Sequence, residues 1–334
     1  MSPLLWRIGS NSLLTKLDQI KQTRTAAFAD DVNIIIYSND ESEFRRRVNL
    51  AYETVSRWCA RAEITLNTGK TEAMSIGKKK IRQITIGDST IKTVVQLKLL
   101  GIMMDNKLNW NGHLDYLKIK SEQLAINLNK TFWLNNRMAL KQKRRLYRSV
   151  FLRMITYASA VWFPEIRKYR TKIEKLIRIQ NRIIRIITGA YQKSNANKLL
   201  ELSNQITIDK ELEILHEVAS QPTDRRGELK REMREDARRE RERFFDLPNC
   251  QFEELKTREA TWCLTGAGPF KSYLHKCGLT DEPICRFCGQ ADETSERLLF
   301  ACDTLNLKCS TKLSAPELDN FATKLIQELR RRPL

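Results

Sequence analysis

The feature that most constrains the fold of this 334-residue chain is a pair of adjacent acids, Asp30 and Asp31, within an apolar stretch. They follow Phe28-Ala29 and precede Val32-Asn33-Ile34-Ile35-Ile36-Tyr37, and β-branched and aromatic residues of this kind favour strands. The pattern predicts a strand, a tight turn and a second strand, with two carboxylates at the tip of the hairpin and buried residues on its flanks.

Two carboxylates at one turn repel each other, so the pair needs a cation, a hydrogen-bond donor or open water. Two Mg²⁺ ions that bridge a phosphoryl transfer are one reason to build such a site. An ordinary acidic hairpin turn is the alternative, because a motif of four residues also occurs by accident. The surrounding sequence bears on this choice.

Four further segments accompany this motif in a definite order along the chain. They are Met1-Ser2-Pro3-Leu4-Leu5-Trp6, Leu66-Asn67-Thr68-Gly69-Lys70-Thr71-Glu72, Leu99-Leu100-Gly101-Ile102 with Asp105, Leu108, Trp110 and His113, and Cys285-Arg286-Phe287-Cys288 with Cys302. Together with the acid pair they resemble the characteristic boxes of reverse transcriptases from non-LTR retrotransposons, of the LINE type represented by the insect R1 and jockey elements. The resemblance covers nearly the whole chain and implies the C-terminal part of such a polyprotein, starting inside the reverse transcriptase domain.

The resemblance implies roles for several residues. Asp30 and Asp31 would be Mg²⁺ ligands of the polymerase palm, Lys70 would face a phosphate or donate a proton, and Gly101 would lie at the primer terminus. In the family, a Gln-Gly pair, a strand with another metal-binding Asp and the fingers subdomain come before the segment at which this chain starts. Because two-metal catalysis needs ligands from both strands, we expect the chain to be inactive on its own.

The composition indicates a polyanionic partner. Lys and Arg number 59 against 40 Asp and Glu, which gives a formal net charge of +19 and a pI of about 9.7. RNA, DNA or an acidic membrane face would suit this balance. No apolar run is long enough to span a bilayer and no secretory signal is recognisable, so we expect no membrane segment and a nuclear or cytoplasmic location.

Most of the surplus charge lies in one stretch, residues 137–193, with 16 Lys or Arg and 2 acids, a net charge of +14. Apolar residues at helical spacing alternate with these basic ones, so we expect the basic side chains on the outer faces of helices. A thumb that rides on a template-primer duplex and contacts its phosphate backbone is predicted, and an ordinary solvated face is the alternative. The predicted contact residues are Lys143, Arg144, Arg145, Arg148, Arg178, Arg182 and Arg185.

The predicted fold is α+β: a partial polymerase palm, an antiparallel sheet with helices, followed by a mainly helical thumb or connection and a small Cys-rich C-terminal module. In the palm we expect a helix over 1–22, a helix over 41–61 that starts at Asp40, and strands over 71–76, 81–86, 91–97 and 99–104. Long helices follow from residue 111, one of them over 166–188 with Gly189 as its C-cap. The predicted domains are 1–110, the palm; 111–222, the thumb; 223–250, a charged linker helix; and 251–334, the C-terminal region.

Residues 223–243 hold nine basic and seven acidic residues and hardly an apolar one. Alternating charge of this kind indicates an exposed, salt-bridged helix or a disordered linker. We assign no function to this segment.

Seven of the eight cysteines follow residue 249, and this clustering favours metal binding over disulfides. Cys285 and Cys288 have the spacing of a metal knuckle, and Cys302 supplies a third thiolate for Zn²⁺. The resembling family has a His where Arg297 stands here, and a guanidinium cannot ligate zinc. A fourth ligand would have to come from Cys277, Cys309 or His275. A degenerate zinc knuckle and a loop of reduced cysteines both stay open.

Three functions are compatible with these observations. The first is a fragment of an RNA-directed DNA polymerase, inactive alone. The second is a non-catalytic protein that binds RNA or DNA through the basic thumb and the Cys knuckle. The third is a protein-interaction remnant whose apolar palm surface is exposed. The sequence does not specify an oligomeric state.

Overall fold

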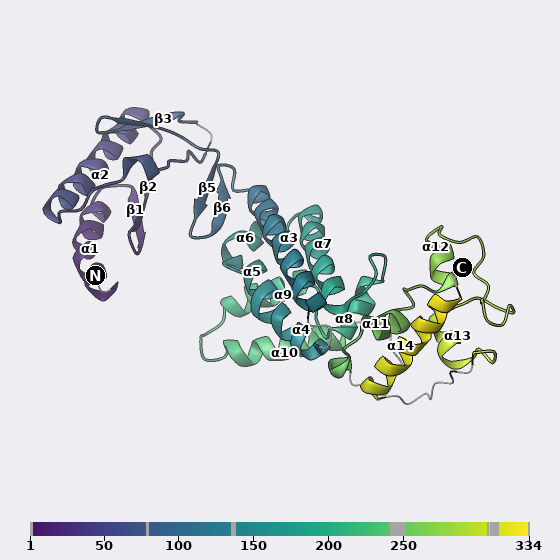
Figure 1. Ribbon diagram of the computed structural model, residues 1–334. Helices are drawn as coiled ribbons and strands as arrows, with labels where there is room; N and C mark the ends of the chain where they lie inside the picture. Colours follow the sequence, from purple (N-terminus) through teal and green to yellow (C-terminus); the bar gives the residue numbers. More distant parts are fainter. Residues whose placement is uncertain are drawn as a thin grey trace. The chain divides into compact units, whose positions relative to one another are not determined.

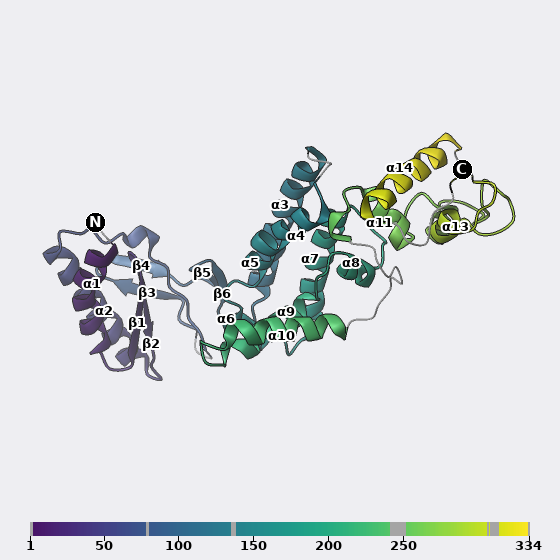
Figure 2. The same cartoon turned by 90° about the horizontal axis from the view of Figure 1, so that it is seen from below.

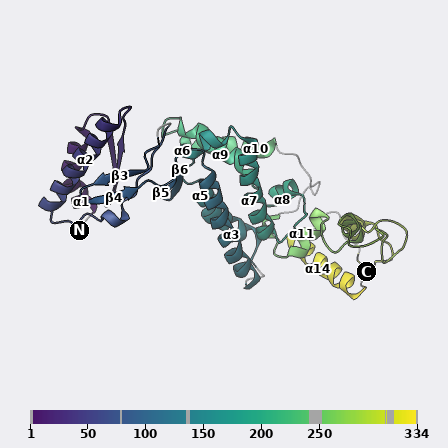
Figure 3. The same ribbon diagram turned by 90° about the horizontal axis from the view of Figure 1, so that it is seen from above.

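The computed structural model describes residues 3–77, 80–134, 138–240, 252–305, 307 and 314–332 (Figure 1, Figure 2 and Figure 3). The chain divides into two compact units, residues 1–112 and 113–334. The first unit combines helices with antiparallel hairpins, and the described part of the second is mainly helical. This arrangement confirms the predicted α+β class.

Two long helices form the frame of the first unit, α1 (Pro3–Asp18) and α2 (Glu41–Arg61), with a short 3₁₀ helix, η1 (Thr68–Lys70). The helix predicted over 41–61 is confirmed with the same bounds. It starts there because the Asp40 side chain accepts a hydrogen bond of 2.8 Å from the backbone N–H of Glu43. The apolar stripe of α2 packs against α1 and the first hairpin.

Six strands of the first unit form three separate antiparallel hairpins, and the described residues do not join them into one sheet. The pairs are β1 (Thr23–Phe28) with β2 (Asp31–Ile36), β3 (Gln83–Ile86) with β4 (Ser89–Lys92), and β5 (Gln96–Leu99) with β6 (Ile102–Asp105).

Three of the predicted strands are wrong in extent. Residues 71–76 form no strand, and only Ala73 makes an isolated bridge, to Thr93. The strand predicted over 91–97 is divided between β4 and β5. The strand predicted over 99–104 is interrupted by a two-residue turn, because Leu100 and Gly101 have φ of +45° and +86°. Apolar content alone could not reveal these turns.

The loop that follows β6 has a clear structural reason for its sequence. Asp105 is buried, and its carboxylate accepts hydrogen bonds from the backbone N–H groups of Lys107, Asn109 and Trp110 at 2.7–3.1 Å. Leu108 and Trp110 have positive φ. The acid therefore pins a strained turn that leads into the next helix.

The second unit begins with a series of helices that are adjacent along the chain. They are α3 (Asn111–Leu134), α4 (Leu140–Leu146), α5 (Leu152–Ile155), α6 (Ser159–Ile166) and α7 (Arg170–Thr188). Between α4 and α5 lies a π-helix, η2 (Tyr147–Phe151), in which the backbone N–H of Leu152 donates to the carbonyl of Tyr147. Gly189 ends α7 with φ of +69°, which confirms the predicted C-cap.

Three helices follow, α8 (Ala196–Leu202), α9 (Ile208–Ala219) and α10 (Arg226–Arg239). The charged segment is thus helical, and α10 lies along α9 (Figure 2 and Figure 3). One row of α10 is apolar and packs on residues of α9 and the loop before it. The row consists of Leu229, Met233 and Ala237, against Ile206, Ile214 and Val218. The sequence analysis noted hardly an apolar residue in this segment and did not predict that the few present would form a packed row.

The remaining described residues, 252–305, 307 and 314–332, form a C-terminal module whose packed core also includes Leu140 of α4 and Leu202 of α8. Its helices are η3 (Phe252–Glu254), α11 (Arg258–Thr265), α12 (Lys271–Lys276), α13 (Ser295–Phe300) and α14 (Ala315–Arg331). Asp319 on α14 accepts hydrogen bonds from the backbone N–H groups of Lys256 and Thr257 and so fixes the start of α11. Phe270, Cys285 and Cys302 lie in the core.

None of the helices in the described part of the chain is long and apolar enough to cross a membrane.

Candidate metal centres and nucleic-acid interface

The acid pair lies where the sequence predicts it, at the tip of the first hairpin. Phe28 pairs with Asp31, so Ala29 and Asp30 form a two-residue turn, and Ala29 has φ of +52°. The indole N–H of Trp6 on α1 donates to the carbonyl of Ala29 at 2.5 Å and holds this turn. Both carboxylates are exposed.

The expectation of buried flanks is wrong on one side of the hairpin. Val32, Ile34 and Ile36 pack on the core between α1 and α2, but Phe28 is 64% exposed and Ile35 also faces outward. Helices cover one face of this two-stranded sheet, and Phe28 and Ile35 stay more than half exposed elsewhere on the hairpin. The two carboxylates therefore lie at the tip of a hairpin that is packed against the core on one face only.

The acid pair alone does not complete a metal site. Mg²⁺ binds proteins through one or two carboxylates together with waters and substrate phosphates, so Asp30 and Asp31 fit part of its ligand set. Within the described ranges, no third acid or His joins them, because the one group of three or more metal-ligating side chains is elsewhere in the chain. These two residues could hold a hydrated ion at the turn.

The other two predicted palm residues lie at the end of a 3₁₀ helix and in a hairpin turn. Lys70 ends η1, where its backbone N–H donates to the Asn67 side chain at 3.1 Å, and its own side chain is exposed. Gly101 forms the β5–β6 turn with Leu100. The turn geometry explains why glycine suits this position, since φ of +86° is costly for other residues.

The predicted phosphate contacts of the first basic helix differ in their surroundings. Arg144 is buried, and its guanidinium pairs with Glu253 at 2.6 Å, so the expectation that it lies on an outer face is wrong. Lys143 is half-buried with its ammonium over the Phe132 ring, and burial lowers its pKa. Arg145 and Arg148 are exposed.

The three predicted contacts on α7 are partly engaged within the protein. Arg178 is exposed and donates to the carbonyl of Glu174 on its own helix. Arg182 is exposed and pairs with Glu122 at 3.3 Å. Arg185 is half-buried, so its expected position on an outer face is only partly right, and burial lowers its pKa. Of the seven predicted phosphate contacts, fewer face solvent than the sequence predicts.

A basic groove of the first unit escaped the sequence analysis. It has a volume of about 510 Å³ and lies between α1 and α2. Its basic lining residues are Lys16, Lys21, Arg46, Arg47, Arg57 and Arg61. They come from α1, from the residues that follow it and from α2, so no single run of the sequence contains them all.

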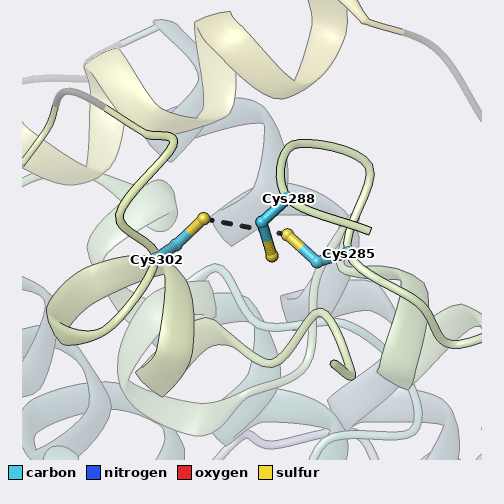
Figure 4. Close-up of side chains that lie close together, drawn as sticks. All are labelled: Cys285, Cys288 and Cys302. Carbon is cyan, nitrogen blue, oxygen red and sulfur yellow. Dashed lines mark hydrogen bonds between the residues drawn. The ribbon is translucent and has the colours of Figure 1, made fainter. Parts of the chain in front are cut away.

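Three cysteines of the C-terminal module converge as a potential metal centre (Figure 4). The sulfurs of Cys285, Cys288 and Cys302 all lie within 4.8 Å of one another, and those of Cys285 and Cys302 are 3.9 Å apart. A tetrahedron with Zn–S bonds of about 2.3 Å has sulfurs about 3.8 Å apart. The spacing therefore fits three ligands of a zinc ion.

The described residues supply no fourth ligand for a tetrahedral zinc site. The guanidinium Nη2 of Arg297 lies 3.5 Å from the sulfur of Cys288. Cys277 and His275 are not part of the sulfur cluster. Cys309 lies outside the described residues. The described chain thus supplies three of the four ligands of a closed structural site and places a cation beside them.

The pKa values of the two knuckle thiols, Cys285 and Cys288, are shifted in opposite directions. A backbone hydrogen bond at Gln290 and the guanidinium of Arg297 lower the pKa of Cys288 to about 6. Burial raises the pKa of Cys285 to about 11. Cys288 is therefore the thiolate at neutral pH, and Arg297 is its counterion.

A buried ion pair holds the knuckle to the rest of the module. The carboxylate of Glu293 is fully buried and accepts hydrogen bonds from the Arg286 guanidinium and from the backbone N–H groups of Lys271 and Arg286. The same guanidinium donates to the carbonyls of Pro269 and Leu329. These contacts tie the knuckle loop to the start of α12 and to the C-terminal end of α14.

Comparison with known proteins agrees with the boxes identified above. Residues 1–104 match the family described as reverse transcriptase (RNA-dependent DNA polymerase). The chain is 23% identical to a Pol polyprotein from the type-1 retrotransposable element R1 of Bradysia coprophila, over 90% of this chain and 33% of that protein. It is 22% identical to one from element R1 2 of Nasonia vitripennis, over 90% of this chain and 82% of the relative.

A third relative is the RNA-directed DNA polymerase from the mobile element jockey of Drosophila funebris, 23% identical over 49% of this chain and 18% of the relative. No solved structure matches the chain. The chain spans about a third of the Bradysia protein. Residues 1–104 are therefore similar to the reverse transcriptase family, and most of the chain is similar to the Pol polyproteins of non-LTR retrotransposons.

Proposed function

We propose that this chain binds the phosphate backbone of RNA and DNA, including a template-primer duplex, and that it does not polymerise DNA on its own. The relatives' names supply the wider context, because the relative from the jockey element is described as an RNA-directed DNA polymerase of a mobile element. The proposed location is nuclear or cytoplasmic, where such a nucleic acid would be met.

One observation carries the binding proposal: residues 137–193 have a net charge of +14, and exposed members such as Arg145, Arg148 and Arg178 face solvent. Phosphate contacts of this kind give affinity without base specificity and release counterions. Binding of a labelled RNA–DNA hybrid should therefore fall steeply as salt rises. A log-log slope near zero would contradict the proposal.

The proposed lack of polymerase activity rests on the acid pair. A two-metal phosphoryl transfer needs ligands from more than one strand to fix both ions. In the structure as described, Asp30 and Asp31 have no third acid beside them. Mg²⁺ bound there would lack the fixed geometry that the reaction requires.

Primer extension tests this part of the proposal. The 334-residue chain is supplied with Mg²⁺, a primed RNA template and dNTPs, alongside Asp30→Ala and Asp31→Ala variants. Asp88→Ala is a matched control, because Asp88 is an exposed acid at another hairpin turn, between β3 and β4. Robust incorporation that is lost in the first two variants and retained in the control would overturn the proposal.

A protein-interaction role is a second candidate, favoured by a different observation. Leu4, Leu5 and Ile8 on α1 are each at least 60% exposed, and Phe28 is exposed on the nearby hairpin. Exposed apolar groups of this density mark contact surfaces. If this role were the main one, Leu5→Ser with Ile8→Ser would abolish self-association while leaving nucleic-acid affinity unchanged.

A further inference from the structure

A row of basic side chains runs along α10, the helix to which the sequence analysis gave no function. Lys230, Arg234 and Arg238 are four residues apart and all half-buried, so they lie on one side of the helix. The neighbouring apolar row of α10 packs on α9. The basic row therefore follows the edge of a packed contact, where its side chains are held in place.

A second basic row approaches the same region from α4 and η2. Arg144 and Arg148 are also four residues apart, and the Arg148 guanidinium donates to the carbonyl of Asn204 at 3.4 Å. Two residues further on, Ile206 packs against the apolar row of α10. Both basic rows therefore border the short loop that precedes α9.

The two rows are close enough for their charges to act on one another. Burial lowers the pKa of Arg148, and the charges of Arg144, Arg238 and Arg234 lower it further. The pKa of Arg238 is lowered by burial and then by Arg234 and Arg144. The pKa of Lys230 is lowered by burial, by Arg234 and by Arg153. The positive charges of the two rows therefore lie near one another.

The acids in this region do not balance the charge. Glu211 is buried and binds Arg234, and Glu253 binds Arg144. Glu235 also acts on Arg238. Of the six basic groups, Arg144 and Arg234 thus have an ion-pair partner, whereas Arg148, Arg153 and Lys230 form no ion pair among the described residues.

Two donors in this region lack a hydrogen-bond partner. The Nε atoms of Arg144 and Arg238 are buried, and neither finds an acceptor among the residues that the structure describes. Buried donors are nearly always paired in folded proteins, so unpaired ones next to surplus positive charge indicate a place for an anion.

We propose that these six side chains form a binding seam for the phosphate groups of a polynucleotide backbone. The seam consists of five exposed or half-buried side chains that would contact the phosphates and of the buried Arg144, which adds its charge from within the fold. The five are Arg148, Arg153, Lys230, Arg234 and Arg238. This inference rests on the proposed function and assigns α10 to the nucleic-acid surface.

The chemistry of the seam selects its ligand. Guanidinium groups present planar, forked donors that match the oxygens of a phosphodiester, and several in a row match the repeat of a backbone. All six side chains are basic, so the seam would read charge and not base sequence.

The test uses a double variant that spares the buried ion pair. Lys230→Gln with Arg238→Gln removes two seam charges and leaves Arg234 to neutralise Glu211. Arg231→Gln with Arg239→Gln removes the same charge from exposed positions of the same helix and is the matched control. The probe is a labelled RNA–DNA hybrid of about 20 base pairs, titrated at several salt concentrations.

The seam variant should bind about tenfold more weakly than the unaltered chain, with a salt slope smaller by about 1 to 2. The control should bind within about twofold of it, because its charges face solvent away from the seam. Equal weakening in the two variants would refute the seam and leave the proposed function standing. Absence of salt-dependent binding by the unaltered chain would refute the proposed function itself.

A second readout keeps the test independent of binding. Because the seam charges repel one another, the seam variant should unfold at a higher temperature than the unaltered chain when no nucleic acid is present, and the control should not.

Acetylation of the unaltered chain covers the case in which the seam variant misfolds. The duplex should protect Lys230 and leave Lys210, an exposed lysine of α9, reactive. Equal reactivity of Lys230 with and without duplex would overturn the proposal.

Discussion

The two units of this protein differ in how fully their apolar side chains are buried. In the first, Phe28 is 64% exposed beside the acid pair; in the second, Phe151 is fully buried, with Trp162 and Phe163 nearby in the sequence equally covered. The contrast teaches that a set of possible metal ligands and a well-packed support for them need not occur in the same unit. In the first unit, the carboxylates of Asp30 and Asp31 lie on a hairpin that is only partly covered. In the second unit, the packing around the three cysteines is dense, but the described residues supply only three of the four zinc ligands.

Two ion pairs, one from each unit, repeat this contrast. Arg45 and Glu41 in the first unit keep 56% and 65% of their side-chain surface exposed, whereas Arg286 and Glu293 in the second keep 7% and 0%. Desolvated pairs are costly to break and solvated pairs are not. Stability should therefore respond to change in the second unit far more than in the first.

The largest expected effect is on apolar packing. Phe151→Ala should destabilise the second unit by about 3–5 kcal/mol, because it leaves a cavity in a core that cannot fully collapse. Phe28→Ala in the first unit should change stability by no more than about 0.5 kcal/mol. Hydrogen exchange, which reports each unit separately, measures both. Similar losses from the two substitutions would break the comparison.

Loss of the buried carboxylate should come next. Glu293→Gln leaves the Arg286 guanidinium buried without a counterion and should cost about 3 kcal/mol in urea-induced unfolding of the C-terminal module. Glu41→Gln removes an exposed partner and should cost less than about 1 kcal/mol. A tolerated Glu293→Gln would mean that the knuckle is held by something other than this pair.

The pH dependence of the second unit should depend on His113, which is buried against Trp162. Burial lowers its pKa to about 4. The unfolded chain has the ordinary pKa of about 6.5, so the unfolded state binds the proton first, and stability present above pH 6.5 is lost as the pH falls towards 4.

The expected loss over that range is about 2 kcal/mol, measured by urea unfolding at several pH values. His113→Gln should remove this dependence between pH 6.5 and 4. His275→Gln, at an exposed position, is the control and should leave the dependence intact. An unchanged pH profile in the His113 variant would show that other groups cause the loss.

The smallest expected effect concerns the incomplete metal centre. Arg297→His supplies a fourth ligand beside the three thiolates, so zinc content after dialysis should rise from below about 0.3 per chain towards about 1. At free zinc ten times above the dissociation constant, the variant should gain about 1.4 kcal/mol. Arg297→Gln is the control, and chelator should affect only the His variant. Full zinc occupancy in the unaltered chain would contradict the role of Arg297 as the counterion.

Local signals explain what the sequence could predict. The bounds of α2 follow from one capping acid and one apolar stripe, and the end of α7 follows from Gly189, all within a few residues. The convergence of Cys285, Cys288 and Cys302 follows from the short spacing of the first two and the family pattern of the third. Such features need no knowledge of distant contacts.

What could not be predicted depends on partners far along the chain. Arg144 looks like a surface charge until Glu253, 109 residues later, pairs with it. The apolar row of α10 is diluted by charges in the sequence and matters only because α9 offers a matching face. The turn at Leu100-Gly101 interrupts an apolar run in which Gly101 is the one sign of a break.

The wide turn η2 has a mechanical consequence for the placement of charge. An α-helix advances 100° per residue, so the extra residue held in this π-type turn rotates everything beyond it by about that angle. Arg153 follows Arg148 by five positions, which brings the two to the same side only where the helix is widened in this way. If η2 became a regular α-helix with all its residues kept, Arg153 would turn by about 100° relative to Arg148, whereas excision of one residue would leave the two side chains four residues apart and on the same side.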